Sequence, residues 1–236
     1  MHFVPLTWLA VCALTLAQMA AAAPMEYGTE AGWGHMLLDR SSGSVSIDVV
    51  GTNGHTCDVG ARLTGPHLDR AEVQSCRFQL QTKAQGRIAV VVEDDARDAC
   101  REHCGARAWF EGDYLPLAAA CTRTGLDRQQ GEALRAYRGK RYVVAFQLWS
   151  QRLAACEKTM TWAEVWRWRN DAAIAASHAG RAADCRQLSQ AVLADVAAVT
   201  LQGETEPFTF APSDAETARP LIAAARHNLT RCNKPR

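Results

Sequence analysis

The hydrophobic and polar positions of this chain follow two different periods. Between residues 33 and 93, apolar side chains alternate with polar ones, as in strands that bury one face. From Leu126 onward, apolar side chains recur every three or four residues, as in amphipathic helices. The change of period predicts an α+β protein in which a small antiparallel β domain precedes an α-helical domain.

The alternating part predicts an antiparallel sheet of four or five strands, residues 24–95 in all. Turn-forming residues separate the alternating segments, among them Asn53-Gly54 and Gly65-Pro66. The expected strands are residues 33–38, 43–50, 56–63, 72–80 and 86–93.

A disulfide-rich connector, residues 96–125, is expected between the two domains. Cys100 and Cys104 are four residues apart, so a short helix would place both on one face, from which they reach separate partners better than each other. Gly105 would end that helix, and residues 106–114 predict a return strand or loop.

The helical domain, residues 126–236, predicts several helices joined by turns. Thr161 and Glu164 have the spacing of a capping box, which marks a helix start. A polar segment, residues 202–213, interrupts the pattern before the last helix. The expected helices are residues 127–138, 143–156, 161–180, 181–198 and 214–229.

Residues 1–23 have the features of a secretory signal peptide. The apolar run 6–17 is too short to span a bilayer and is followed by small residues. No later run reaches about 18 apolar residues, so the exported protein is not expected to span a membrane.

Arginine outnumbers lysine and alanine is abundant, which favours a bacterial protein of the periplasm or outside the cell. A eukaryotic secreted protein glycosylated at Asn228 is the alternative.

The cysteine count adds a covalent framework to this prediction. Without Cys12, eight cysteines remain, and an even number in an exported chain predicts disulfides. We expect Cys57–Cys76 across strands and Cys156–Cys185 between helices. Zinc binding by the connector is disfavoured, because zinc sites use two close pairs of ligands and only one is present. The remaining cysteines to be paired are Cys100, Cys104, Cys121 and Cys232.

Two resemblances suggest function. Residues 138–145, 170–174 and 178–181 resemble the tetratricopeptide layout, which implies paired helices used as a binding surface. Residues 33–121, through the cysteine and glycine pattern of 100–114, resemble periplasmic lysozyme inhibitors. That resemblance implies a loop inserted into the glycan cleft of lysozyme, and the matching positions are Ser42, Gly43, Gly112, Asp113 and Tyr114.

Two tryptophans complete the candidate binding residues. Trp168 lies between arginines, including Arg167, which is the composition of an interface hot spot. Trp109 in the connector is either packed or used in binding. The formal net charge of +1 provides no attraction for nucleic acid.

The chain contains no nucleophile elbow, zinc-protease motif or phosphate-binding loop, so we expect a protein without enzymatic activity, cofactor or metal. Carboxylate pairs need no motif, and Glu111 with Asp113 or Glu93 with Asp95 would supply one. The acidic run 93–95 is otherwise interpreted as a helix N-terminus.

The preferred hypothesis is therefore an exported inhibitor or immunity-type factor that blocks a lysozyme-class cell-wall hydrolase by loop insertion. A periplasmic interaction scaffold that uses the helical domain and a glycan-active hydrolase are the alternatives.

Overall fold

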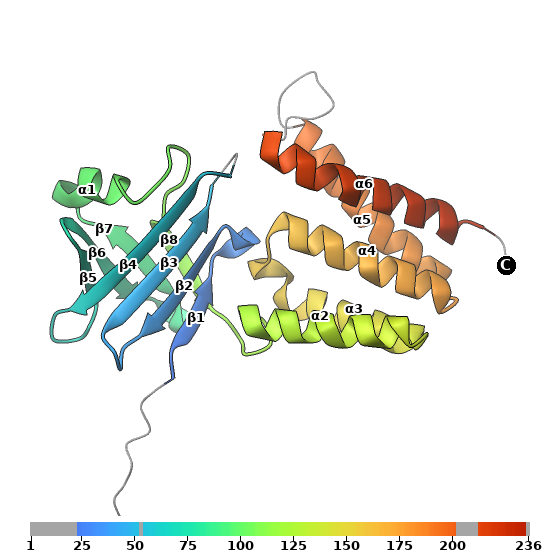
Figure 1. Ribbon diagram of the computed structural model, residues 1–236, viewed down its shortest axis with the longest axis horizontal. Helices are drawn as coiled ribbons and strands as arrows, with labels where there is room; N and C mark the ends of the chain where they lie inside the picture. The colour runs from blue at the N-terminus through green and yellow to red at the C-terminus, as the bar shows by residue number, and fades with distance from the viewer. Residues whose placement is uncertain (1–22, 52–53, 202–211, 235–236) are drawn as a thin grey trace, which may run out of the picture.

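A computed structural model of the protein describes residues 23–51, 54–201 and 212–234. It consists of a β barrel and a stack of helices that lie side by side (Figure 1). The expected signal peptide and most of the polar segment 202–213 lie outside the described residues.

The β unit is a closed barrel in which each strand pairs with the next in antiparallel orientation and the last strand pairs with the first. Closure is made by Tyr27 opposite Pro116 and Gly28 opposite Leu115. The strands are β1 (Met25–Gly28), β2 (Gly34–Asp39), β3 (Ser44–Val50), β4 (Thr56–Thr64), β5 (Arg70–Val73), β6 (Cys76–Thr82), β7 (Ile88–Val92) and β8 (Gly112–Pro116).

The prediction of a small sheet of four or five strands is therefore wrong. The prediction of a connector separate from the sheet is also wrong, because β8 lies within it. The first strand precedes the first expected strand, residues 33–38, and the last comes from within the expected connector, so neither barrel-closing strand is among the predicted strands. Residues 106–114 were expected to return as a strand or loop, and β8 does begin at Gly112.

The barrel interior is filled by apolar side chains. Strand β4 shows strict alternation of buried and exposed residues along its length. Eight strands enclose a space that side chains alone can fill. The interior is therefore a packed core rather than a ligand cavity, and its largest fully buried members include Met36, Ile47, Phe78, Leu80, Phe110 and Tyr114.

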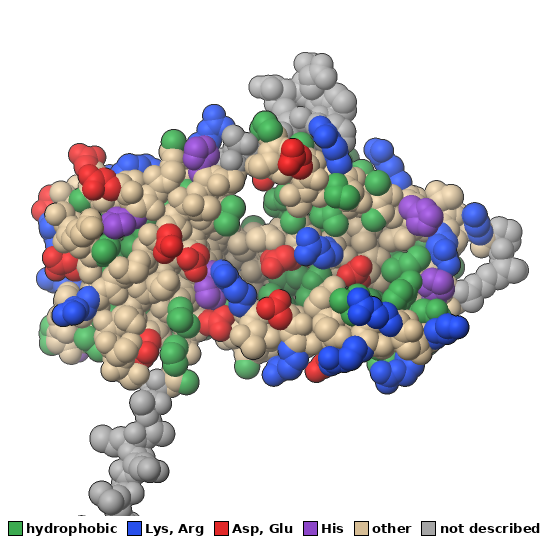
Figure 2. Space-filling model, viewed as in Figure 1, with side chains coloured by type: hydrophobic (Ala, Val, Ile, Leu, Met, Phe, Trp, Pro, Cys, Tyr) green, Lys and Arg blue, Asp and Glu red, His purple; other side chains and the backbone are tan. Residues whose placement is uncertain are grey.

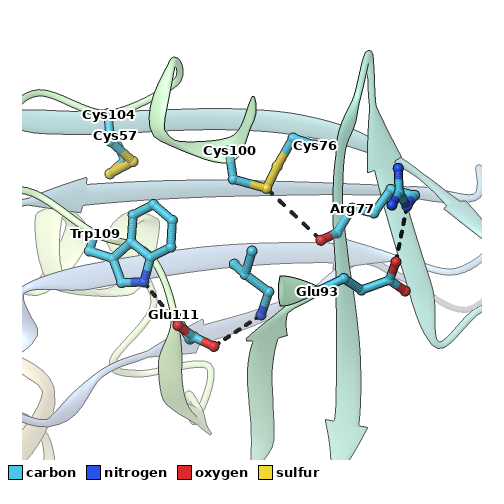
Figure 3. Close-up of a disulfide and its surroundings, with 9 residues drawn as sticks. Cys57, Cys76, Arg77, Glu93, Cys100, Cys104, Trp109 and Glu111 are labelled. Atoms are coloured by element: carbon cyan, nitrogen blue, oxygen red, sulfur yellow. Dashed lines mark hydrogen bonds and ion pairs between the residues drawn. A yellow bond between two sulfur atoms is a disulfide. The ribbon is translucent and has the colours of Figure 1, made fainter. Parts of the chain in front are cut away.

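The segment between β7 and β8, which we call the excursion (residues 93–111), is fastened to the barrel by two disulfides (Figure 3). It contains the short helix α1 (Arg97–Arg101). Cys104 bonds Cys57 of β4, and Cys100 bonds Cys76 of β6. The two connector cysteines thus reach separate partners, as their spacing predicted.

The expected Cys57–Cys76 disulfide is wrong, because both cysteines bond residues of the excursion instead, and β4 and β6, which carry them, are not neighbours in the sheet order. Strands two apart in a sheet are separated by roughly 9–10 Å, beyond the reach of a disulfide.

The excursion also completes the sheet beside β4. Strand β5 pairs with β4 only from Arg62 to Thr64, which leaves the beginning of β4 without this neighbour. There the Asp58 amide donates to the carbonyl of His103 at 3.2 Å, and the Gly105 amide donates to the carbonyl of Thr56 at 2.8 Å. The excursion therefore takes the place of a strand where β5 is too short.

The helical unit contains α2 (Arg123–Arg138), α3 (Tyr142–Cys156), α4 (Trp162–His178), α5 (Ala182–Leu201) and α6 (Pro212–Cys232). The capping box at Thr161 and Glu164 is present, as predicted. Helix α4 packs against α3, α5 and α6, and small side chains permit the close approach. Its fully buried alanines are Ala172, Ala173, Ala175 and Ala176.

The helical disulfides are Cys121–Cys156 and Cys185–Cys232, so the expected Cys156–Cys185 bond is wrong. Cys156 ends α3, whereas Cys185 lies in the first turn of α5, and the whole of α4 runs between them. A helix of 17 residues is about 25 Å long, so these two cysteines lie at opposite ends of the stack.

The barrel and the helices meet at a close junction between the β1–β2 loop and the turn before α4. Lys158 contacts Glu30 at 2.7 Å. Gly32 has a φ of +67°, and a Cβ atom placed there would lie 2.3 Å from the backbone nitrogen of Thr161. Only glycine fits this position without displacing the helical unit.

We predict that Gly32→Ala destabilises the protein more than Gly43→Ala. Gly43 has nearly the same φ, +68°, but no atom within 4 Å of an added Cβ, so it provides a control for the backbone penalty. The control should lose about 1 kcal/mol of unfolding free energy, and Gly32→Ala roughly 1–3 kcal/mol more through the clash. Urea unfolding followed by tryptophan fluorescence measures both; equal losses would show that the junction tolerates a side chain.

Candidate functional site

The candidate site is a cleft between the mouth of the barrel and the start of the helical unit, with a volume of about 450 Å³. Figure 2 shows the surface indented between the two units. The lining residues come from the β1–β2 loop, the end of β3, the excursion and the first turns of α4 and α6. They are Ala31, Trp33, Val49, Val50, Gly51, Arg107, Trp109, Thr161, Trp162 and Asp214.

Trp33 is held by contacts with β8. Its ring centroid lies 6.0 Å from that of Tyr114. A Cβ on Gly112 would lie 3.2 Å from the Trp33 ring, and Gly112 has a φ of +148°. Gly112 therefore allows the indole to lie directly over the backbone.

Trp109 is fixed on two sides. The guanidinium carbon of Arg101 lies 4.4 Å from its ring centroid, which is cation–π geometry. Its indole nitrogen donates to Glu111 at 3.0 Å (Figure 3). This restraint presents the indole to the cleft in one orientation, so little side-chain entropy remains to be lost on binding.

Glu111 accepts three hydrogen bonds, from Trp109, from the backbone amide of Val92 at 3.1 Å and from Arg97 at 3.1 Å. Burial by itself raises the pKa of this carboxyl, but these donors and the arginine charge outweigh it, and the net pKa is lowered. Glu111 thus positions Trp109 and stays ionised, which does not suit a general acid.

Neither expected carboxylate pair is arranged as a reacting pair. Asp113 is exposed and lies 4.0 Å from Arg87, while Glu111 accepts the hydrogen bonds described above, including that from Trp109. Glu93 and Asp95 both bind Arg77, at 3.0 and 2.6 Å (the first contact is drawn in Figure 3). All these carboxylates therefore act in ion pairs.

The cleft combines aromatic surface with one charge of each sign. Arg107 is exposed in the excursion, and Asp214 lies in the first turn of α6. Within the described part of the chain, neither side chain has an ion-pair partner. A ligand with an apolar group between an anionic and a cationic or hydrogen-bonding group would match this arrangement.

The residues predicted from sequence do not form a single surface. Of them, only Trp109 lines the cleft. Tyr114 is buried in the barrel, where its hydroxyl donates to the carbonyl of Phe110 at 2.8 Å and burial raises its pKa. Trp168 is 5% exposed and belongs to the helical core, while its neighbour Arg167 is exposed. Tyr114 and Trp168 are therefore corrected from binding residues to core residues.

Ser42 and Gly43 lie in the exposed hairpin between β2 and β3, at the end of the barrel opposite the cleft. The carboxylate of Asp39 accepts hydrogen bonds from the hydroxyl of Ser41 at 2.6 Å and from the backbone amides of Ser41 and Ser42 at 2.9 and 3.1 Å. These bonds lower the pKa of Asp39 to about 2, and they fix the conformation of the hairpin tip.

Sequence reasoning missed Trp33, Trp162, Arg107 and Asp214. They come from four separate segments that meet only when the barrel and helices dock. One feature of the sequence could have indicated the two tryptophans, because each lies at the start of an element. Trp33 directly precedes Gly34, the first residue of β2, and Trp162 directly follows Thr161, the N-cap of α4.

Comparison with known proteins gives no relative. No family model matches the chain, and neither a curated protein nor a solved structure matches it. Among the described residues, no helix combines the length and apolar character needed to cross a bilayer.

We predict that Glu111→Gln lowers stability above pH 5 and that the difference from the parent protein shrinks in acid. Because the folded-state pKa is lowered, the unfolded chain binds more protons in acid. The contribution of Glu111 is then present above the unfolded carboxyl pKa of about 4.3 and is lost as the pH falls through the folded value. Thermal unfolding from pH 3 to pH 7 measures this.

Asp113→Asn provides the matched control, because this neighbouring carboxylate is exposed and has only a distant arginine partner. It should change stability little at any pH. A pH dependence of the same size in both variants would contradict the role given to Glu111.

Proposed function

We propose that this is an exported binding protein that holds an extended segment of another protein in the cleft between barrel and helices. The observation that supports the proposal most is the lining itself: three tryptophans with Arg107 and Asp214. Tryptophan and arginine are the residues most enriched in the energetic centres of protein interfaces.

The chemistry of the cleft favours a polypeptide. Indole rings accept apolar side chains, while an arginine and an aspartate bind the carbonyls, amides and charges that alternate along a peptide. The volume of about 450 Å³ lies within the range of specific ligand pockets. Buried apolar side chains fill the barrel interior, so the ligand is expected at the mouth.

The disulfides support a location outside the cytoplasm. Four disulfide bonds fit a protein of an oxidising, extracytoplasmic compartment. Export by a cleaved signal peptide, residues 1–23, and residence in the periplasm or outside the cell are part of the proposal. The two carboxylate pairs considered for the glycan-active alternative give it little support, because Glu93, Asp95 and Glu111 are all engaged in ion pairs.

We predict that peptides selected from a displayed random library on the mature protein bind in this cleft. Arg107→Ala and Asp214→Ala should each weaken binding of the selected peptides by about 5- to 20-fold, since each removes a charged hydrogen-bonding group. Isothermal titration calorimetry measures the affinities. Ser42→Ala, at the other end of the barrel, is the control and should bind normally.

Arg107→Glu extends this test by reversing a charge at an exposed position. Repeating the selection on this variant should enrich basic residues where the first selection enriched acidic ones. If no peptide is enriched, or if selected peptides bind all variants equally, the proposal is wrong.

The rigid hairpin at the opposite end supports a second candidate, inhibition of a lysozyme-class hydrolase by loop insertion. Its tip is exposed, and Asp39 holds Ser41 and Ser42 in place. A loop fixed in its bound conformation loses less entropy on insertion, which is what an inhibitory loop needs.

For this candidate we predict that the protein protects bacterial cell walls from a c-type, g-type or i-type lysozyme. Ser42→Arg should abolish protection because it enlarges the tip, whereas Arg107→Ala should leave it unchanged. Turbidity of a cell-wall suspension measures lysis. Absence of protection at a molar excess of the protein over each lysozyme would exclude this candidate and leave the cleft proposal intact.

A further inference from the structure

A second hollow lies at the end of the helical unit farthest from the barrel. It has a volume of about 630 Å³ and is formed by the end of α4, the start of α5 and the end of α6. This cavity shares no lining residue with the cleft. Its polar lining residues are Ser177, His178, Arg186, Arg231, Asn233 and Lys234.

The charged side chains that line this cavity are basic. Arg186, Arg231 and Lys234 are exposed cations, and its described lining contains no aspartate or glutamate. The nearby carboxylate of Asp184 contacts the guanidinium of Arg181 at 2.8 Å. On the face drawn in Figure 2, Lys and Arg side chains likewise gather over this end of the helical unit.

The turn between α2 and α3 adds further cations at the same end of the stack. Arg138, Lys140 and Arg141 are all exposed. Helix α5 begins at Ala182, which lines the cavity, so the positive end of a 20-residue helix adds to the field. Like charges at such density repel one another, and an anion would relieve the repulsion.

The cavity is held in shape by covalent and ring contacts. The Cys185–Cys232 disulfide joins the start of α5 to the end of α6. The guanidinium of Arg231 lies 3.3 Å from the Nε2 atom of His178, and the His178 ring stacks on Tyr142 with centroids 4.5 Å apart. The position of Arg231 is therefore set before any ligand arrives.

We propose that this basic cavity binds a phosphate group, carried either by a small ester or by an anionic lipid headgroup. Guanidinium groups match the geometry of phosphate oxygens and bind them with paired hydrogen bonds. Cations from α5, α6 and the segment after α6 surround one open space, so a compact, multiply charged anion can contact several at once. The site is open to solvent, which accommodates a phosphate attached to a larger molecule.

The test uses the full mature protein and inorganic phosphate as the probe, at constant ionic strength. We expect phosphate to bind with a Kd on the order of 1 mM, measured by calorimetry. Arg186→Gln and Arg231→Gln should each weaken binding at least about 10-fold, since each removes a charge-assisted contact. Within the described residues, the Arg186 side chain makes no ion pair or side-chain hydrogen bond, so its variant should fold normally.

Arg226→Gln is the matched control, because Arg226 is an exposed arginine on α6 that does not line the cavity. It removes the same charge and should bind phosphate as the parent does. Near-ultraviolet circular dichroism checks the fold of each variant. Equal weakening by Arg226→Gln, or no phosphate binding at about 10 mM, would overturn the proposal.

Vesicle flotation distinguishes the two sources of phosphate. Binding to phosphatidylglycerol vesicles but not to phosphatidylcholine vesicles, lost in Arg186→Gln, would assign the site to a lipid headgroup. Phosphate binding without flotation would assign it to a soluble phosphate ester.

Discussion

Two disulfides on the excursion determine how this protein is arranged. Cys57–Cys104 and Cys76–Cys100 fix the excursion, a segment of nearly twenty residues, across the barrel mouth. The positions of β8 and of the helices after it depend on where this segment ends. In a chain-entropy estimate, loops of 47 and 24 residues make these bonds worth roughly 3–4 kcal/mol each. The same segment fills the gap beside β4, sets the position of β8 and presents Trp109 and Arg107 to the cleft.

The sequence predicted those elements whose pattern is long enough to be periodic. The helices, the capping box at Thr161 and strands such as β3 and β7 lie close to their expected positions. Strands β5 and β6 were merged into one because they are joined by a two-residue turn, Gln74-Ser75, in which Gln74 has a φ of +54°. A Gln-Ser turn does not carry the Asn-Gly signal by which such hairpins are recognised.

Disulfide pairing and the cleft could not be predicted, because both depend on how elements are placed in three dimensions. Helix α4 shows why the exposure of a single side chain is also difficult to predict. It is covered by α3, α5 and α6, so its buried surface extends almost around the helix, and both Trp166 and Trp168 are buried. A local pattern of one exposed and one buried face does not apply to such a central helix.

Closure of the barrel has a consequence for recognition. Every described strand has a neighbour on both sides, so an incoming chain finds little free backbone with which to extend the sheet. Partners that dock by adding a strand to an open edge gain affinity from main-chain hydrogen bonds and tolerate many sequences. The proposed ligand would therefore have to be recognised through side-chain chemistry, and its binding would be sensitive to single substitutions in the ligand. Closure also protects the barrel from joining other copies edge to edge.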